Sequence, residues 1–202
     1  MSTYLVVFTG VLILAVVGTP LARKLGLHLN VVDHPDPLRK VHTLPTPRVG
    51  GVAIFLSTLI VTLLLQEIYN INQLTGILVG ATLMSFLGFW DDRFTLGAGI
   101  KLVGQFIAVG LLIATGVTVQ VFPYTALNLG VTVLWVVGIT NAFNLLDNMD
   151  GLSGGIAAIA ALYFALMCSF TGQYLVGALS IAVVAACIGF LIHNWNLSLI
   201  HI

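Results

Sequence analysis

The polar residues best suited to chemistry stand between long apolar stretches, and the most regular group is NAFNLLDNMDGLSGG, from Asn141 to Gly155. Amides and carboxylates recur there at every third position: Asn141, Asn144, Asp147 and Asp150. Residues three apart share a face of an α-helix, but over the whole run such a stripe would wrap to the opposite side. We therefore expect the helix to break near 147–151, where glycines begin. A helix cap would explain Asp150 alone, not four polar groups in register.

A second group of charges lies in GFWDDRFTLGAGIKLVGQ, from Gly88 to Gln105. Asp91 and Asp92 end one apolar run, and Lys101 opens the next. Adjacent residues on a helix point about 100° apart, so we expect the two aspartates to have different roles. Charges beside hydrocarbon are costly, which favours a function. The alternative is a solvated helix end in which Arg93 neutralises one aspartate and Lys101 only snorkels to the interface, instead of holding a lipid phosphate.

The third group is a basic, proline-rich stretch, DHPDPLRKVHTLPTPRVGG, from Asp33 to Gly51. Its four prolines disfavour a helix. Its basic residues, suited to cradling a phosphate, are Arg39, Lys40, His42 and Arg48. The alternative is a topogenic signal or a patch that attracts anionic lipid.

The donor atoms in these groups favour magnesium over other metals. Carboxylate and amide oxygens suit Mg2+, which binds through one or two carboxylates plus substrate phosphates, and no Cys/His set accompanies them. Cys168 and Cys187 lie inside apolar runs, so we interpret them as small buried hydrophobes. Walker A and GxGxxG motifs are absent, which excludes a soluble-type nucleotide fold. A formal net charge of zero gives no reason to expect a nucleic-acid partner.

The elements that must position these groups are membrane-spanning helices. The 202 residues are 59% hydrophobic and 7% charged, with a mean hydropathy of +1.10, which is more apolar surface than a soluble domain hides. Backbone groups in lipid must be bonded internally, so we predict an all-α, polytopic membrane protein. Seven stretches approach the necessary length: Thr3–Leu21, Gly51–Gln66, Leu74–Trp90, Ala98–Gly116, Ala126–Phe143, Gly154–Thr171 and Tyr174–Ile192. The alternating segment 117–125, with Pro123, predicts a short structured loop.

The charged residues indicate the orientation of these spans. All Lys and Arg residues fall on or beside connections of one side: Arg23, Lys24, Arg39, Lys40, Arg48, Arg93 and Lys101. The positive-inside rule makes that side the cytoplasm, with the N-terminus outside and the C-terminal end inside. No charge precedes Arg23, so the first stretch is predicted to be a span, not a cleaved signal. All six aspartates share this side and Glu67 lies outside, which predicts a cytoplasmic site at the cell membrane.

The three groups resemble motifs of the bacterial polyprenyl-phosphate N-acetylhexosamine-1-phosphate transferases, glycosyltransferase family 4, in particular the undecaprenyl-phosphate GlcNAc-1-phosphate transferase branch. The resemblance rests on D-H-P-x-x-x-R-K-x-H-x-x-P-T-P-x-x-G-G from Asp33, on Asp91–Asp92, and on N-A-F-N-x-x-D-x-x-D-G-L from Asn141. It implies transfer of an N-acetylhexosamine-1-phosphate, GlcNAc-1-phosphate in this branch, from a UDP-sugar to polyprenyl (undecaprenyl) phosphate. Magnesium would be the cofactor, UMP the by-product, and a cell-envelope polysaccharide, such as teichoic acid or lipopolysaccharide, the product of the pathway.

The resemblance also implies roles for individual residues. Asp91 and Asp92 would be catalytic, either activating the lipid phosphate or binding magnesium together with Asn144. The nucleotide sugar would be bound by the third stretch: Asn144, Asp147 and Asp150. The lipid phosphate would be bound by basic residues: Lys101, Arg39, Lys40 and His42.

The chain departs from the family pattern near its end. Asn148 stands where many members have glycine, and the family's later M-G-D-x-G-S stretch and histidine-rich loop do not follow Asn196. Leu197–Ile202 (LSLIHI) equals the translation of a transposon-derived sequencing adapter. We therefore expect residues 1–196 to be a membrane-embedded transferase domain, incomplete at its C-terminus and inactive alone, and 197–202 to be a non-native tail.

Two other classes of function fit intramembrane carboxylates. An ion-coupled membrane transporter would place them near the midplane between repeated halves, whereas here they lie at one interface and no repeat is evident. A non-catalytic scaffold predicts that Asp91→Asn and Asp147→Asn leave function intact. The sequence leaves open which UDP-sugar and which polymer are used, whether an aspartate becomes covalently modified, and whether a homodimer forms.

Overall fold

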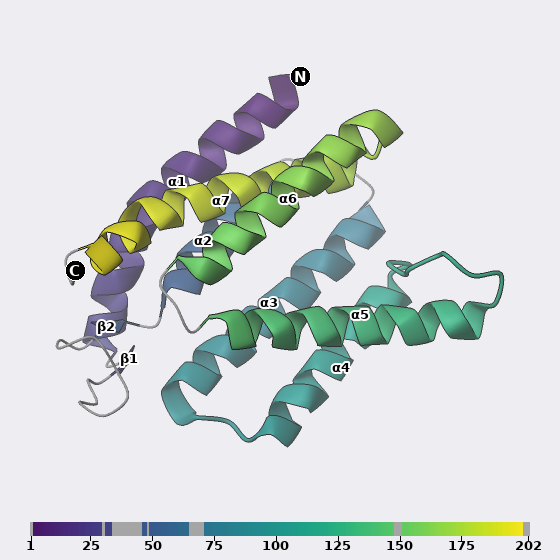
Figure 1. Ribbon diagram of the computed structural model, residues 1–202, viewed down its shortest axis with the longest axis horizontal. Coiled ribbons are helices and arrows are strands. Elements are labelled where there is room, and N and C mark those ends of the chain that lie inside the picture. The colour runs from purple at the N-terminus through teal and green to yellow at the C-terminus, as the bar shows by residue number, and fades with distance from the viewer. Residues whose placement is uncertain are drawn as a thin grey trace. The chain divides into compact units, whose positions relative to one another are not determined.

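The computed structural model describes residues 2–29, 31–33, 46–47, 49–64, 71–147 and 151–199, with the backbone alone at Ser2, Asp33, Thr46, Ile71 and 195–199. Within those ranges, seven α-helices and one short ladder follow each other along the chain (Figure 1). Their bounds are α1 Ser2–His28, β1 Val32–Asp33, β2 Thr46–Pro47, α2 Gly50–Leu64, α3 Ile71–Phe94, α4 Ala98–Ala114, α5 Thr125–Leu146, α6 Leu152–Thr171 and α7 Tyr174–Leu199. The chain divides into a first unit, Met1–Leu64 with Met149–Ile202, and a second unit, Leu65–Asn148.

Each of the seven predicted apolar stretches corresponds to one of the seven helices, although α4 ends at Ala114, two residues before the predicted end, and the last two residues of the stretch 51–66 lie outside the described part. Five of them, α1, α3, α5, α6 and α7, are long and apolar enough to cross a membrane, judged by length and composition. Helices α2 and α4 have 15 and 17 residues, so they extend about 22 and about 25 Å, less than the roughly 30 Å of a bilayer's hydrocarbon core. The all-α membrane fold is confirmed, and the count of seven spans stays a prediction.

Several helices extend beyond the apolar stretches that predicted them. α1 continues past Leu21 to His28, α3 past Trp90 to Phe94, and α7 past Ile192 to Leu199. The predicted connection over residues 91–97 is therefore wrong in its first four positions, which are helical. The physical reason is that a polar side chain ends the apolar run but not the helix, because each added residue still gains a backbone hydrogen bond.

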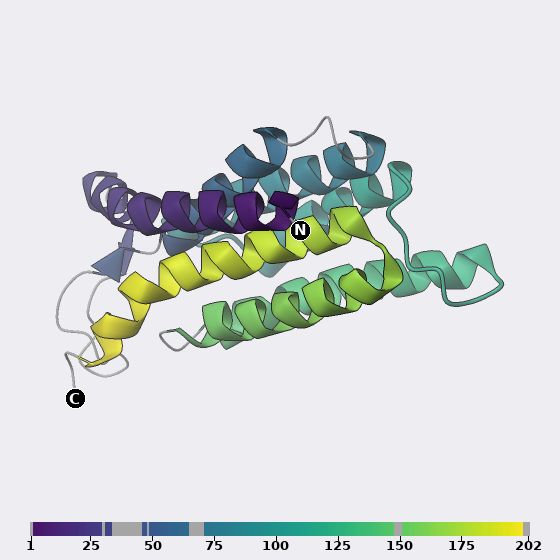
Figure 2. The same ribbon diagram turned by 90° about the horizontal axis from the view of Figure 1, so that it is seen from above.

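Small side chains make the packed core of the first unit. α7 contacts α1, α2 and α6, and Figures 1 and 2 both show it lying between α1 and α6. Ala15 of α1 and Ala185 of α7 are fully buried. At Gly189 the helices approach so closely that an added Cβ would lie 2.7 Å from Ala15 Cβ and 3.1 Å from the backbone nitrogen of Val16. The absence of a side chain at Gly189 therefore sets the distance between α1 and α7.

A two-residue antiparallel ladder joins the ends of the basic stretch. Val32 pairs with Pro47 and Asp33 with Thr46. Gly26 of α1 leaves room for this region, because a Cβ there would lie 2.6 Å from a methyl group of Val49. The residues between the strands, which include Arg39, Lys40 and His42, lie outside the described part of the chain.

The second unit is built on α4, which contacts both α3 and α5. Gly104 of α4 admits Leu87 of α3, whose side chain would lie 2.9 Å from an added Cβ. Ala108 and Val109 of α4 are buried. α5 is much less buried, since only 6% of its most apolar stretch lies inside the structure. Packing therefore holds α3 to α4 more firmly than it holds α5.

The loop that joins α4 to α5 is held by side chains of α5. Asn128 Oδ1 accepts hydrogen bonds from the backbone N–H groups of Val121 and Phe122, and its Nδ2 donates to the carbonyl of Phe122. The hydroxyl of Thr132 accepts from the N–H of Val119. These bonds confirm the predicted structured loop, since side chains replace the missing backbone partners.

Candidate functional site

The site begins where α3 ends, because Asp91 closes that end with both its backbone and its side chain. Its carbonyl oxygen accepts the N–H of Thr95 at 2.8 Å, and its Oδ1 accepts the N–H of Leu96 at 2.8 Å. Thr95 lies in the left-handed region, with φ of +51°. Glycine is usual there, and a β-branched residue costs of order 1 kcal/mol or more. The bonds to Asp91 hold this strained turn and thereby orient the carboxylate.

Asp91 also meets the second predicted residue of this stretch, Lys101. The Lys101 Nζ lies 2.6 Å from Asp91 Oδ2, and their side chains are 31% and 20% exposed. Lys101 stands in the first turn of α4, where the helix dipole disfavours a cation, so the facing carboxylate offsets both that dipole and the lysine charge. Lys101 therefore neutralises Asp91 and is held at the turn between α3 and α4 instead of extending freely along the interface.

Asp92 is partly buried next to Asp91 in the last turn of α3. On the helix its side chain leaves about 100° away from that of Asp91. The guanidinium of Arg93 lies 5.8 Å from the ring centre of Phe94. The expectation that the two aspartates have different roles stays a prediction, and the contacts above give Asp91 one of those roles, the placement of Lys101.

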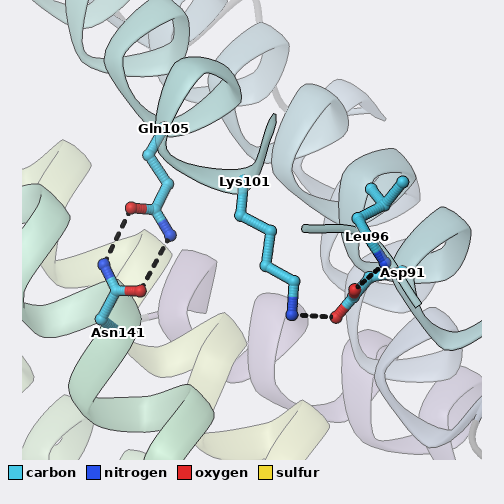
Figure 3. A network of polar contacts seen from close by, with 5 residues as sticks. All are labelled: Asp91, Leu96, Lys101, Gln105 and Asn141. Atoms are coloured by element: carbon cyan, nitrogen blue, oxygen red, sulfur yellow. Dashed lines mark hydrogen bonds and ion pairs between the residues drawn. The ribbon is translucent and has the colours of Figure 1, made fainter. Parts of the chain in front are cut away.

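One helical turn beyond Lys101, α4 is joined to α5 by a reciprocal amide pair (Figure 3). Gln105 Nε2 donates to Asn141 Oδ1 at 3.3 Å, and Asn141 Nδ2 donates to Gln105 Oε1 at 2.8 Å. Sequence reasoning placed Asn141 in the polar stripe without a role and did not single out Gln105. The available signal was an amide four residues after Lys101 on an otherwise apolar helix, which shares a face with the lysine.

The third stretch breaks where the sequence predicted. α5 ends at Leu146, Asp147 caps it with its N–H bonded to the carbonyl of Phe143, and α6 begins at Leu152. Gly151 has φ of +73°, which only glycine adopts without strain. Asn144 is exposed in the last turn of α5, and Asp147 is exposed at its end. Asp150 lies outside the described residues.

The predicted site is therefore assembled in part. The structure brings Asp91 to Lys101 and adds Gln105 with Asn141, all within the second unit. The predicted phosphate-binding residues of the first loop lie outside the described part: Arg39, Lys40 and His42. Their role stays a prediction.

A magnesium site was predicted at Asp91, Asp92 and Asn144. Among the described residues, no three His, Cys, Asp or Glu side chains gather closely enough to hold a metal ion. Magnesium needs only one or two protein carboxylates, and the oxygens of Asp92 and Asn144 have the required chemistry. Both oxygens of Asp91 already have partners, Leu96 and Lys101, so a metal ion at Asp91 would have to share or displace them. The magnesium assignment stays a prediction.

Comparison with known proteins connects this arrangement to a family. Residues 74–202 match the family described as Glycosyl transferase family 4. A protein of Bacillus subtilis named "Probable undecaprenyl-phosphate N-acetylglucosaminyl 1-phosphate transferase" is 35% identical, over 97% of this chain and 57% of its own length. A decaprenyl-phosphate N-acetylglucosaminephosphotransferase of Mycobacterium tuberculosis is 31% identical, over 86% of this chain and 49% of its own.

A second group of relatives, with a different name, is also similar to the chain. A phospho-N-acetylmuramoyl-pentapeptide-transferase of Desulforudis audaxviator is 33% identical, over 94% of this chain and 66% of its own length. The chain thus spans about half to two thirds of the length of these curated relatives. Because the matches cover nearly all of this chain, the similarity includes both units.

Proposed function

The chain belongs to glycosyl transferase family 4, and from this premise we propose that the complete protein transfers GlcNAc-1-phosphate from UDP-GlcNAc to a polyprenyl phosphate. The names of the relatives from Bacillus subtilis and Mycobacterium tuberculosis support the acceptor and the sugar. The observation that carries the proposal is the contact between Lys101 and Asp91 at a helix end. That contact holds an oriented, partly exposed cation against a carboxylate at the end of an apolar helix, which supports a phosphate site there.

The reaction needs charge neutralisation and positioning more than covalent chemistry. An oxygen of the lipid phosphate attacks the β-phosphorus of the UDP-sugar. The bond from that phosphorus to the bridging oxygen breaks, and UMP leaves with the oxygen. Lys101 is assigned to the anionic lipid phosphate, since an ammonium group acts as a point charge for phosphate. Asp91 positions Lys101. The lysine side chain is partly exposed, which leaves room for a phosphate to contact its ammonium group as well.

The nucleotide sugar is assigned to the end of α5. Asn144 and Asp147 stand there as exposed amide and carboxylate groups. Magnesium, held by Asp92 and Asn144, would supply neutralisation of the diphosphate charge when bound. Asp150, two residues before the start of α6 in the sequence, extends this set along the same connection.

A cytoplasmic location for the site is part of the proposal. Every charged residue between 71 and 147 stands near the turn between α3 and α4 or at the end of α5. In the first unit, Arg23 and Lys24 stand on the last part of α1. The positive-inside rule then favours seven spans in the cell membrane, with the N-terminus outside and the site facing the nucleotide-sugar pool.

The experiment is lipid labelling by membranes that carry the complete protein. With radiolabelled UDP-GlcNAc, polyprenyl phosphate and magnesium, we expect a labelled lipid that extracts into organic solvent, together with UMP. Lys101→Met should lower the rate of product formation about 100- to 1,000-fold. The matched control is Thr140→Val, because the Thr140 hydroxyl only bonds the carbonyl of Val136 in its own helix. Absence of lipid product combined with proton-driven solute uptake would support the transporter instead.

A further inference from the structure

We propose that Gln105 and Asn141 are positioning residues that fix the nucleotide-binding end of α5 relative to Lys101. The proposal rests on the proposed transferase function. It assigns a task to a part-buried pair, with Gln105 buried and Asn141 exposed, whose printed bonds do not include the helix-end carboxylates and which lies outside the predicted substrate ligands.

The geometry of the pair suits a joint between two helices. Each amide donates to the other's oxygen, at 3.3 and 2.8 Å, so two bonds act at once (Figure 3). A single hydrogen bond lets the helices rotate about it, whereas a planar reciprocal pair restricts both distance and rotation. The second Nδ2 hydrogen of Asn141 bonds the carbonyl of Val137, at 2.8 Å, which fixes that side chain to its own helix.

Burial of Gln105 separates a positioning role from substrate binding for that residue. The Gln105 side chain is 5% exposed, so a substrate has almost no access to it. Placing an amide among apolar side chains costs free energy unless a partner satisfies it, and two leucines would fill a helix interface without that requirement. Among described residues of α5, only Thr132 is buried, so apolar packing does little to fix the position and rotation of this helix against α4.

The pair stands one turn away from the site on both helices. Lys101 precedes Gln105 by four residues, about 6 Å along α4, and Asn144 follows Asn141 by three residues, about 4.5 Å along α5. Figure 3 shows the Lys101 side chain leaving α4 toward Asp91 while that of Gln105 leaves toward Asn141. A shift at the pair therefore moves the lysine and the nucleotide ligands relative to each other. A misplacement of about 1 Å costs up to roughly 100-fold in rate.

The test compares five variants of the complete protein: Gln105→Leu, Asn141→Leu, the double leucine variant, the exchange Gln105→Asn with Asn141→Gln, and Thr140→Val. The measurements are kcat, KM for each substrate, and the melting temperature. The exchange keeps the summed length of the two side chains, because one loses the methylene that the other gains. Thr140→Val changes a neighbour of Asn141 without touching the pair.

We expect each single leucine variant to lower kcat about 10- to 100-fold at saturating substrates, with the folded protein retained. The double variant should be no worse than the poorer single, since both remove one shared contact, and the exchange should restore kcat to within about three-fold. If the variants lose only melting temperature, or if the single effects multiply in the double variant, the positioning role is wrong.

An independent measurement separates this proposal from the proposed function. Spin labels at Leu102 and Leu145, both exposed side chains on α4 and α5, report the distance between the helices without any turnover. The distance distribution should be narrow in the native pair and broad in Gln105→Leu. A native protein that makes no lipid product would contradict the transferase function alone, whereas an unchanged distribution would overturn the positioning pair.

Discussion

The two units of the chain hold their helices together by different means. In the first unit, half of the most apolar stretch of α7 is buried, and Gly189 lies close to the backbone of α1. In the second unit only 6% of the most apolar stretch of α5 is buried. Polar contacts join α4 to α3 at Lys101 and α4 to α5 at Gln105. The comparison indicates that close packing of small side chains sets the helix geometry of the first unit. In the second unit packing joins α3 to α4, whereas polar groups at and near the proposed site contribute more to the position of α5.

The largest expected effect is loss of transfer on Lys101→Met in the second unit. Removing the cation leaves the lipid phosphate and Asp91 without their shared neutralising group, so kcat/KM should fall about 100- to 1,000-fold, about 2.7–4 kcal/mol in the barrier. Steady-state labelling of polyprenyl phosphate measures it. The matched control is Lys24→Met on α1, which removes an exposed positive charge from the first unit. Equal losses in both variants would remove the contrast between the units.

Adding one methyl group should destabilise the first unit at its closest helix contact. Gly189→Ala would bring a Cβ against Ala15 and the α1 backbone, neither of which has a flexible end to move aside. We expect a loss of about 1–3 kcal/mol in unfolding free energy, visible as a lower melting temperature in detergent. Gly155→Ala in α6 is the control, since an added Cβ meets nothing within 4 Å there. Equal melting temperatures for the two variants would contradict the role of close packing.

A smaller effect is expected when Asp91 loses its charge but keeps its shape. Asp91→Asn retains an oxygen for the N–H of Leu96 but cannot pair ionically with Lys101. With Lys101 less firmly oriented, kcat should fall about 10-fold, which corresponds to about 1.4 kcal/mol. In the background of Lys101→Met the same substitution should add little, because its target is already absent. Full additivity would show that Asp91 acts on the substrate by another route.

The smallest effect is expected at the strained turn. Thr95→Gly removes a β-branched side chain from a backbone with φ of +51°, so the second unit should gain about 0.5–1 kcal/mol in stability. Thr95→Ala, which keeps a Cβ in the same conformation, serves as the control. A melting temperature that falls with glycine but not with alanine would show that the threonine side chain is needed there.

Much of the fold follows from local features of the sequence. Apolar runs long enough to form helices marked all seven, and the break near 147–151 followed from a polar stripe that could not stay on one face. Helix ends were less predictable, because the backbone ladder of α3 continues through Asp91 and Asp92 after the apolar run has stopped.

The candidate site was predictable only as far as residue types reveal it. Asp91, Lys101 and Asn144 stood out as polar groups at the ends of apolar runs. The pairing of Asp91 with Lys101 was not predictable, because the choice between Arg93 and Lys101 as its partner depends on the turn at Thr95. The pairing of Gln105 with Asn141 depends on which face of α4 meets α5, and spacing within one helix carries no information about that.

The most direct measurement of the central claim follows the two phosphates of the donor separately. UDP-GlcNAc is prepared with radioactive phosphorus in either the α- or the β-phosphate and incubated with polyprenyl phosphate and membranes carrying the complete protein. Sugar-1-phosphate transfer predicts that the β-label moves into the lipid and the α-label remains in UMP. A lipid that gains the sugar while the β-label stays in soluble UDP would contradict the account, as would a β-labelled lipid formed at the native rate by Lys101→Met.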